Sequence, residues 1–166
     1  FKQKTAYEIM PSLVGSEMCI RDRITSEGAL TEALDSYDLE NWFKLTINEI
    51  RTSTGSVSIK FLGKEEMQSL NKKFRSKDHP TNVLAFPIDN SLDLDTDSLG
   101  DIAICHEVIL KEAKEQNKEV CDHMAHIFIH GVLHLLGHDH HQEAQAEIME
   151  NLERRILSKI GVADPY

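Results

Sequence analysis

The sequence predicts an α/β fold of the α+β type, in which a small mixed sheet of three to four strands is flanked by five to six helices. Three observations predict this architecture. Segments with the alternation of a half-buried strand are interleaved with segments of helical period. Two helical segments then close the chain. A length of 166 residues suits one domain and is sufficient to bury roughly two-thirds of the unfolded surface.

The first part of the domain is predicted to contain a helix, a strand and a second helix. Residues 38–51 carry a largely helical apolar stripe, with Ser36 or Asp38 as candidate N-terminal cap. The stripe consists of Leu39, Trp42, Phe43, Leu45, Ile47 and Ile50. Residues 57–62 alternate as a half-buried strand does, and a glycine follows them. Residues 64–74 predict a short helix with three inward apolar side chains, which are Met67, Leu70 and Phe74.

Two further strands and three helices are predicted to follow. Residues 82–88 predict a second strand with a proline near its end, and residues 101–105 predict a third. The highly charged segment 106–119 is predicted to be helical. Residues 122–136 predict a histidine-rich helix, and residues 142–160 a final amphipathic helix.

Composition and cysteine usage limit the class of protein. The net charge of −10 argues against broad, non-specific nucleic-acid binding, so any nucleic-acid surface must be local. Cys19, Cys105 and Cys121 are widely spaced and lack a C-x-x-C pair, which favours reduced thiols. No apolar stretch approaches the ~18 residues needed to span a bilayer, and no secretory signal is visible. We therefore expect a cytoplasmic protein without a membrane partner.

The N-terminal segment differs in character from the rest of the chain. Residues 11–23 show neither the period of a helix nor that of a strand. They resemble a translated sequencing-adaptor read-through of the kind found at the ends of environmental sequence assemblies. An ordinary variable N-terminus is the alternative interpretation. We expect residues 1–23 to be a non-native segment and residues 24–166 to be a single domain.

The most informative motif is a run of three histidines and a glycine at metal-site spacing. His130 and His134 are four residues apart, so on a helix their imidazoles lie on one side and can share one ion. Gly137 suits the left-handed position at which helices commonly end, and the reversed chain can return His140 as a third ligand. Three protein ligands leave one coordination position open, as in catalytic zinc sites. The predicted metal site thus lies on a helix of the C-terminal half and the turn after it.

This run of histidines has other interpretations. Ordinary surface histidines would rarely show this spacing together with a glycine at the turn. The spacing H-x-x-x-H-x-x-G-x-x-H also occurs in metzincin proteases, but those enzymes need a glutamate base directly after the first histidine, where this chain has Gly131. Asp139 can orient a ligand or accept a proton, although an aspartate in a turn more often binds its own backbone. Three imidazoles would also accept nickel, copper or cobalt.

A short basic cluster is the second candidate site. Lys72, Lys73, Arg75 and Lys77 place four of the 18 basic residues within six positions. On an acidic protein this is a natural place for a phosphate to bind. A solvated helix end would also favour cations, because of the helix dipole, and composition alone does not separate the two interpretations.

Four segments of the chain carry a resemblance to a known family. They are residues 70–87 with the pattern F-R-x-K-D-x-P-T-N-V-L, residues 99–102, the histidine run 130–140, and the closing residues 164–166. With these segments the chain resembles the YbeY family of bacterial rRNA-processing metallo-endoribonucleases, from roughly Leu39 to the C-terminus. The first pattern and the histidine run together are specific for the family.

The resemblance implies an α/β fold with a small sheet flanked by helices, and one zinc ion per chain on His130, His134 and His140. It implies a catalytic arginine near the metal, which corresponds to Arg75, and this favours the phosphate interpretation of the basic cluster. The planar guanidinium can hold two oxygens of a pentacoordinate phosphorane at once. His126, one turn before the first ligand, has no ligand role in the family pattern, so we expect it beside the ligands or in helix packing.

The function that the resemblance implies is single-strand-specific, metal-dependent endonucleolytic cleavage of RNA, in 16S rRNA 3′-end maturation and ribosome quality control. The expected partners are single-stranded RNA, 16S rRNA and ribosome or 30S assembly components, and no DNA. Lys72, Lys73 and Lys77 are expected to guide the RNA backbone. Two alternatives stay open: a zinc-dependent hydrolase of peptides or small molecules, and a non-catalytic ribosome-assembly factor with structural zinc.

Overall fold

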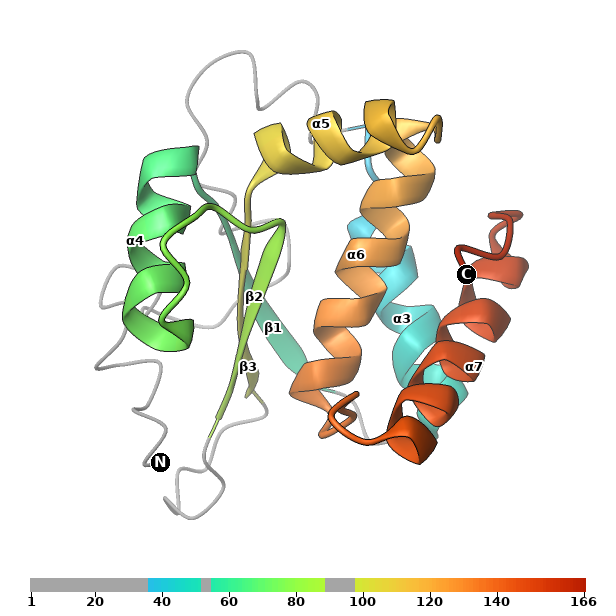
Figure 1. Cartoon of the computed structure of the whole chain (residues 1–166). Coiled ribbons are helices and arrows are strands. Elements are labelled where there is room, and N and C mark those ends of the chain that lie inside the picture. Colours follow the sequence, from blue (N-terminus) through green and yellow to red (C-terminus); the bar gives the residue numbers. More distant parts are fainter. Residues whose placement is uncertain (1–35, 52–54, 89–97) are drawn as a thin grey trace.

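The structure is a computed structural model that describes residues 36–51, 55–88 and 98–166 (Figure 1). Its helices in these ranges are α3 (Leu39–Ile50), α4 (Lys64–Arg75), α5 (His106–Glu115), α6 (Val120–Leu135) and α7 (Glu143–Lys159). Its strands are β1 (Ser56–Phe61), β2 (Val83–Pro87) and β3 (Ser98–Ile104). Each helix and strand predicted from the sequence is present, and the α+β architecture is confirmed.

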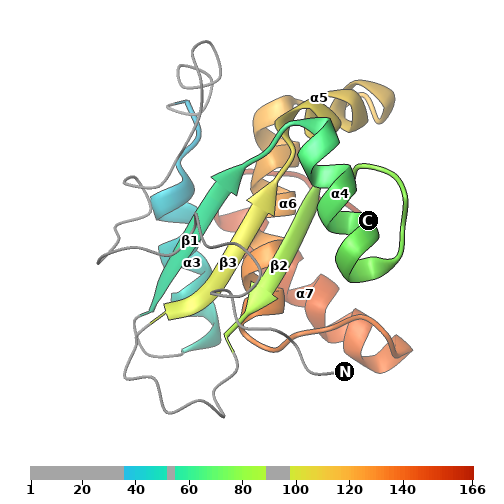
Figure 2. The same ribbon diagram turned by 90° about the vertical axis from the view of Figure 1, so that its left-hand side faces the viewer.

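The three described strands form one mixed sheet in the order β1-β3-β2 (Figure 2). Strand β1 is parallel to β3, with Ile59 opposite Ile102, whereas β2 is antiparallel to β3, with Ala85 opposite the same Ile102. The central strand β3 is therefore hydrogen-bonded on both sides. Strand β3 begins at Ser98, three residues before the predicted start at Asp101.

Two cores lie on opposite faces of the sheet, because side chains alternate along each strand. The larger core contains Ile59, Ile102 and Phe128 and is covered by α3, α6 and α7, whereas α4 covers the other face with Met67 (Figure 1). Helix α6 contacts β2, β3, α3, α5 and α7. This central packing makes α6 a rigid base for the side chains on its remaining face.

The boundaries of two helices differ from the prediction. The charged segment predicted to be helical over 106–119 ends at Glu115, because Asn117 adopts a left-handed backbone with φ 52°. Helix α6 accordingly begins at Val120. The expected non-native segment 1–23 lies outside the described residues. None of the described helices is long and apolar enough to cross a membrane.

Candidate metal centre

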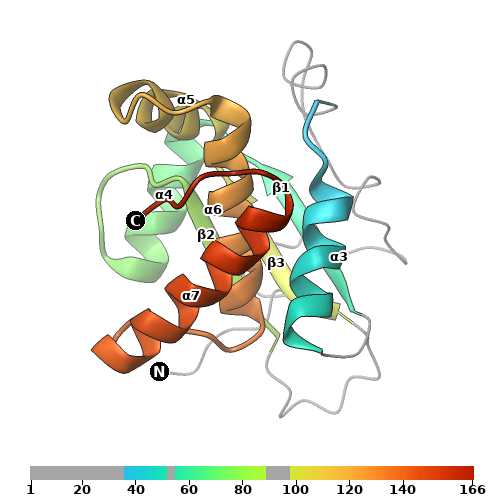
Figure 3. The ribbon, with the colours of Figure 1, turned by 90° about the vertical axis from the view of Figure 1, so that its right-hand side faces the viewer.

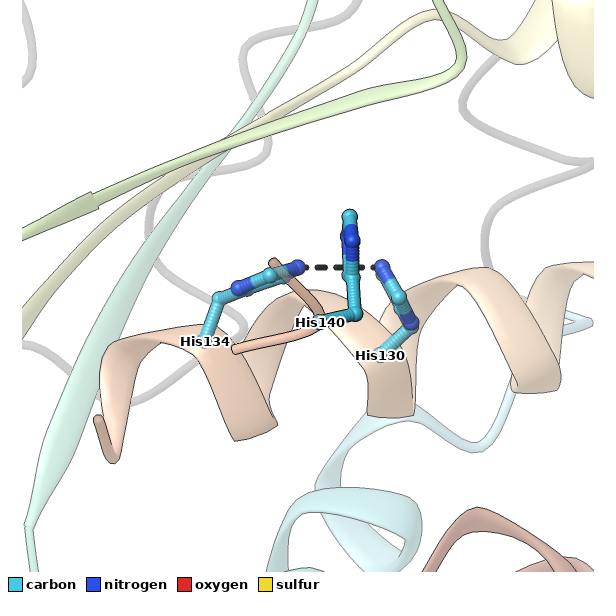
Figure 4. Close-up of side chains that lie close together, drawn as sticks. All are labelled: His130, His134 and His140. Carbon is cyan, nitrogen blue, oxygen red and sulfur yellow. Dashed lines mark hydrogen bonds between the residues drawn. The ribbon is translucent and has the colours of Figure 1, made fainter. Parts of the chain in front are cut away.

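Three imidazoles converge at the C-terminal end of α6 (Figure 4). The Nε2 atoms of His130 and His134 lie 3.0 Å apart. The ring of His140 lies 5.0 Å from that of His134 and 5.5 Å from that of His130, measured between centroids. One nitrogen of each histidine lies within 4.8 Å of the other two. The fold thus brings together the three residues predicted as ligands.

The turn that returns His140 depends on Gly137. Helix α6 ends in a Schellman motif, in which the His138 N–H donates to the Leu133 carbonyl at 3.0 Å and the Gly137 N–H donates to the His134 carbonyl at 3.1 Å. This motif requires a left-handed residue, and Gly137 has φ 90°. The predicted helix stop is confirmed.

Asp139 holds the backbone of the turn. One carboxylate oxygen accepts the His140 N–H at 2.7 Å, and the other lies 3.1 Å from Nε2 of His141. The carboxylate is therefore directed to its own turn, as an aspartate in a turn commonly is. Its contribution is to fix the chain that carries His140.

The donor set fits a zinc ion. Ligand atoms 2.0–2.1 Å from a tetrahedral zinc lie about 3.3 Å from one another, a spacing that nitrogens within 4.8 Å can reach by small ring rotations. Burial, followed by the charges of His130 and His140, lowers the pKa of His134 to about 4. The imidazole of His134 is consequently neutral at pH 7, with a lone pair available for a metal.

Glu153 of α7 contacts the three-histidine cluster through His130. This role was not predicted from the sequence. Its side chain is 0% exposed. One oxygen lies 2.5 Å from Nδ1 of His130, and the other lies 3.3 Å from Nε2 of His126 and accepts the Tyr166 hydroxyl. Burial raises the pKa of Glu153, but hydrogen bonds from His126 and His130 outweigh it and bring the pKa to about 2. A buried carboxylate therefore anchors two helices and the end of the chain.

The Glu153 carboxylate determines which ring nitrogen of each neighbouring histidine carries the proton and which carries the lone pair. Because Nδ1 of His130 donates to Glu153, the lone pair of His130 lies on Nε2, the atom that faces His134. Nε2 of His126 lies against the same carboxylate, 3.3 Å away, and His126 is not part of the three-histidine cluster. This placement is consistent with the expectation that His126 lies beside the ligands or in helix packing.

Replacement of Glu153 by glutamine should lower zinc affinity roughly 10- to 100-fold, as loss of a carboxylate behind a metal-bound histidine commonly does. The amide cannot accept hydrogen bonds on both sides, so His130 loses its fixed tautomer. Competition with a chromophoric chelator measures the affinity. Glu147→Gln, an exposed position on the same helix, is the matched control and should leave it unchanged. Equal affinities for E153Q and the wild type would contradict the assigned role.

We expect the zinc-free protein to lose stability as the pH falls below about 6.5. The pKa of His134 is about 4 in the folded state, below its ordinary value of 6.5, so protons favour the unfolded chain in this window. The loss between pH 7 and pH 5 should be at most about 2 kcal/mol. Burial lowers the pKa values of His106 and His138 as well, and these residues add to the slope. Below pH 4.5, protonation of Glu153 extends the loss.

Denaturant unfolding at pH 7 and pH 5 measures this dependence. His134→Gln should reduce the slope without abolishing it, because His106 and His138 remain. An identical slope in the wild type and the variant would show that His134 is not protonated preferentially in the unfolded chain.

Gly131 occupies the position at which a metzincin carries its glutamate base. A Cβ atom there would lie 3.2 Å from Val83 Cγ2 and 3.5 Å from Ile102 Cδ1. The position is thus filled by close packing of α6 on the sheet, and a larger side chain would have to displace its neighbours. The peptidase alternative is not favoured.

An open pocket of about 150 Å³ contains the three histidines. Its other lining residues are Arg75, Thr81, Asn82, Val83, Ala85, His126, Ile127, Gly131 and Tyr166. The pocket therefore joins the end of α4, the start of β2, one face of α6 and the last residue of the chain. It combines a cation, apolar walls and a candidate metal centre.

Arg75 is the one member of the basic cluster that lines this pocket. It is the last residue of α4, and Ser76 ends the helix in a left-handed conformation with φ 56°. The guanidinium charge contributes to the lowered pKa of His134, after burial and the other histidines. The arginine predicted near the metal therefore lies in the same pocket as the three histidines, and its catalytic role stays a prediction.

The three lysines do not line the pocket. Lys72 pairs with Asp78 at 3.0 Å, and the ammonium of Lys73 lies 5.3 Å from the centroid of the Phe74 ring. Lys77 is exposed just beyond the helix end. All three lie on the surface next to Arg75 in the chain, so a role in guiding RNA stays a prediction.

A second, partly buried network holds the wall of the pocket at the start of β2. The Asn82 amide donates to Glu112 at 3.0 Å and its carbonyl oxygen accepts the Val83 N–H at 2.7 Å. Glu112 in turn lies 2.8 Å from Nε2 of the buried His123. Burial raises the pKa of Glu112, but hydrogen bonds from His123 and Asn82 make the net shift downward. The polar side chain of Asn82 is therefore held by Glu112 and by the backbone of β2.

Comparison with known proteins gives a consistent family assignment. The model of the family described as endoribonuclease YbeY matches residues 25–161. An endoribonuclease YbeY of Francisella tularensis subsp. tularensis (strain SCHU S4 / Schu 4) is 46% identical over 127 residues, which cover 74% of this chain and 76% of the relative. An endoribonuclease YbeY of Idiomarina loihiensis is 41% identical over 139 residues, or 82% of this chain and 85% of the relative.

The fold has a counterpart among solved structures. A solution structure of a Thermotoga maritima protein superposes with a TM-score of 0.52 and 25% sequence identity. The match covers 86% of this chain and 97% of that protein. The α+β architecture is thus shared with a structure determined by experiment.

Proposed function

Since the chain belongs to the YbeY family of endoribonucleases, we propose that this zinc-dependent endoribonuclease cleaves single-stranded RNA at the 3′ end of 16S rRNA. We place its action in rRNA maturation and ribosome quality control, in contact with 30S assembly components. His130, His134 and His140 are the proposed zinc ligands, and Arg75 is the proposed catalytic residue. The observation that carries this assignment is the convergence of Arg75 and the three histidines on one pocket.

Each protein group has a defined task in this proposal. Zinc held by the three histidines supplies Lewis-acid polarisation of a phosphoryl oxygen. Arg75 binds the non-bridging oxygens of the scissile phosphate and neutralises the charge that develops on them. Lys72, Lys73 and Lys77 attract the neighbouring backbone from the surface beside the pocket.

The two alternative functions lack a supporting observation. A peptidase of the metzincin kind would need a base at position 131, where Gly131 packs on the sheet. A purely structural zinc would need no arginine at the pocket and commonly has four protein ligands, whereas three histidines form this cluster among the described residues.

The proposed substrate is tested with two RNAs of equal length and composition, one spanning a 16S rRNA 3′ end and one scrambled. We expect the first to be cleaved at a defined position and with a higher kcat/KM, and isolated 30S particles to be cleaved at the same position. Equal cleavage of both RNAs, with no defined position in either, would contradict the substrate assignment. A 2′,3′-cyclic phosphate on the product would identify the RNA 2′-hydroxyl as nucleophile.

A further inference from the structure

The chain folds back after α7 and crosses α6, so that its last described residue forms part of the pocket wall (Figure 3). Residues 160–166 follow α7 without regular structure. The Tyr166 side chain reaches Glu153 and His126, on α7 and α6 respectively. An aromatic residue distant in sequence is thereby placed in the same pocket as the histidine cluster.

The polar end of Tyr166 is directed into the protein. Its hydroxyl donates to the buried Glu153 and lies 3.3 Å from Nε2 of His126. Burial, followed by the hydrogen bond to Glu153, raises the pKa of the phenol, so the group stays protonated. The residue is nevertheless 52% exposed. Because the hydroxyl is engaged inside, the surface that Tyr166 offers to the pocket is largely that of its ring.

The ring is also held in a fixed orientation. Its plane stands at 84° to that of His126, with centroids 5.5 Å apart. The guanidinium of Arg154 lies over one face of the ring, 5.2 Å from its centroid, which leaves the other face for a base, and it pairs with Asp164 at 3.0 Å. Asp164 in turn accepts the Tyr166 N–H at 2.9 Å. The contacts of the ring with His126 and Arg154, of the hydroxyl with Glu153 and of the backbone N–H with Asp164 together restrict the orientation of this exposed ring.

The position of the ring is coupled to the metal ligands through one carboxylate. One oxygen of Glu153 binds Tyr166 and the other binds His130. Glu153 is fully buried and contacts both residues, so it links the position of the Tyr166 ring to that of His130. A group that stacks on Tyr166 would therefore be held at a defined position relative to the reacting phosphate.

We infer that Tyr166 is the stacking platform for a nucleobase of the bound RNA, next to the nucleotide that is cleaved. This inference rests on the proposed function for its choice of ligand. An exposed, rigid aromatic ring beside a phosphate site is the feature on which single-stranded nucleic acids stack their bases. The surface of the ring accepts any base, because every base has a π-face.

The pocket wall favours stacking over reading of the base edge. The polar groups of Asn82 are engaged by Glu112 and Val83, and Nε2 of His126 is engaged by Glu153. These polar groups therefore already have partners within the protein. The subsite should tolerate all four bases and prefer purines, whose larger faces stack more strongly.

The test compares Tyr166→Leu with Tyr166→Phe, because leucine removes the ring and phenylalanine removes only the hydroxyl. The zinc-loaded protein is given a short single-stranded RNA that carries 2-aminopurine at each position in turn. We expect one position to show fluorescence quenching in stopped flow before cleavage, in the wild type and in Y166F but not in Y166L. Y166L should raise KM roughly 5- to 100-fold and leave kcat nearly unchanged.

A second experiment places an abasic site at the RNA position where 2-aminopurine fluorescence is quenched. The abasic site should raise the KM of the wild type as Y166L does, and should add nothing to the KM of Y166L. Additive effects of the abasic site and Y166L would overturn the inference. So would a Y166F variant with the same loss as Y166L together with weakened zinc binding, because the residue would then act through Glu153 alone.

Failure of the stacking inference can be distinguished from failure of the proposed function. The stacking experiment uses any single-stranded RNA, so a lack of preference for the 16S rRNA 3′ end would overturn the proposed substrate only. A wild-type protein that cleaves the 16S 3′-end RNA without quenching at any position would overturn the stacking inference only.

Discussion

Replacement of His134 by alanine should abolish RNA cleavage and lower zinc affinity by more than the roughly 10- to 100-fold expected for a supporting residue such as Glu153. His134 contributes one of three nitrogens that lie within 4.8 Å of one another, and no fourth protein ligand is present in the cluster found among the described residues. The two histidines that remain in the variant would bind the zinc ion only weakly. Metal analysis by mass spectrometry and cleavage of a single-stranded RNA measure the two effects.

The control for this variant is His141→Ala. His141 is an exposed histidine next to His140 in the chain, and it does not belong to the cluster. We expect it to keep full zinc content and cleavage. His134 is only partly buried, so its loss should leave the fold intact, which circular dichroism can verify. Full zinc content and cleavage in H134A would show that the metal lies elsewhere.

Replacement of Arg75 by alanine should reduce kcat roughly 100- to 1000-fold while zinc affinity stays unchanged. Arg75 lines the pocket of the three histidines and is not within their cluster. Its expected task is to hold the phosphate oxygens as charge develops on them, which alters the rate and not the metal. Arg75→Lys should restore only part of the rate, because an ammonium keeps the charge and lacks the planar fork.

Lys64→Ala is the matched control for the lost charge. Lys64 lies at the opposite end of the same helix, where it pairs with Glu107 at 3.6 Å. The Lys64→Ala variant should cleave RNA at the wild-type rate. A normal kcat in R75A would contradict the catalytic assignment, whereas a loss of zinc in R75A would show that the arginine maintains the metal centre.

The local parts of the metal centre could be predicted from the sequence because they are consecutive. His130 and His134 share a helix face by spacing alone, and Gly137 marks the helix end by its freedom to adopt φ 90°. The turn that follows is short, so the return of His140 is also a local property. Helices and strands with a clear period were predictable for the same reason.

The supporting parts could not be predicted because they are not local. Glu153 is one of several acidic residues on α7, and nothing in its neighbourhood distinguishes it from the exposed Glu147. Its role arises from the packing of α7 on α6 and from burial. Tyr166 reaches the pocket only because the chain reverses after α7. The order β1-β3-β2 likewise depends on pairing between distant segments.

In the basic cluster, too, the local grouping could be predicted from the sequence, whereas the position of each side chain relative to the pocket could not. The sequence places Lys72, Lys73, Arg75 and Lys77 together, but a helix directs neighbouring side chains to different faces. Of the four, Arg75 is the one that lines the pocket. The resemblance to the family had already singled out this residue, and composition alone had not.

RNA cleavage should depend on a metal ion held by the three-histidine cluster. The most direct measurement is cleavage of a single-stranded RNA by the wild-type protein before chelation, after chelation, and after zinc is returned. We expect cleavage to stop when the metal is removed and to recover as one equivalent of zinc per chain is added, with no recovery in H134A. Cleavage that persists in the fully metal-free protein would contradict the claim.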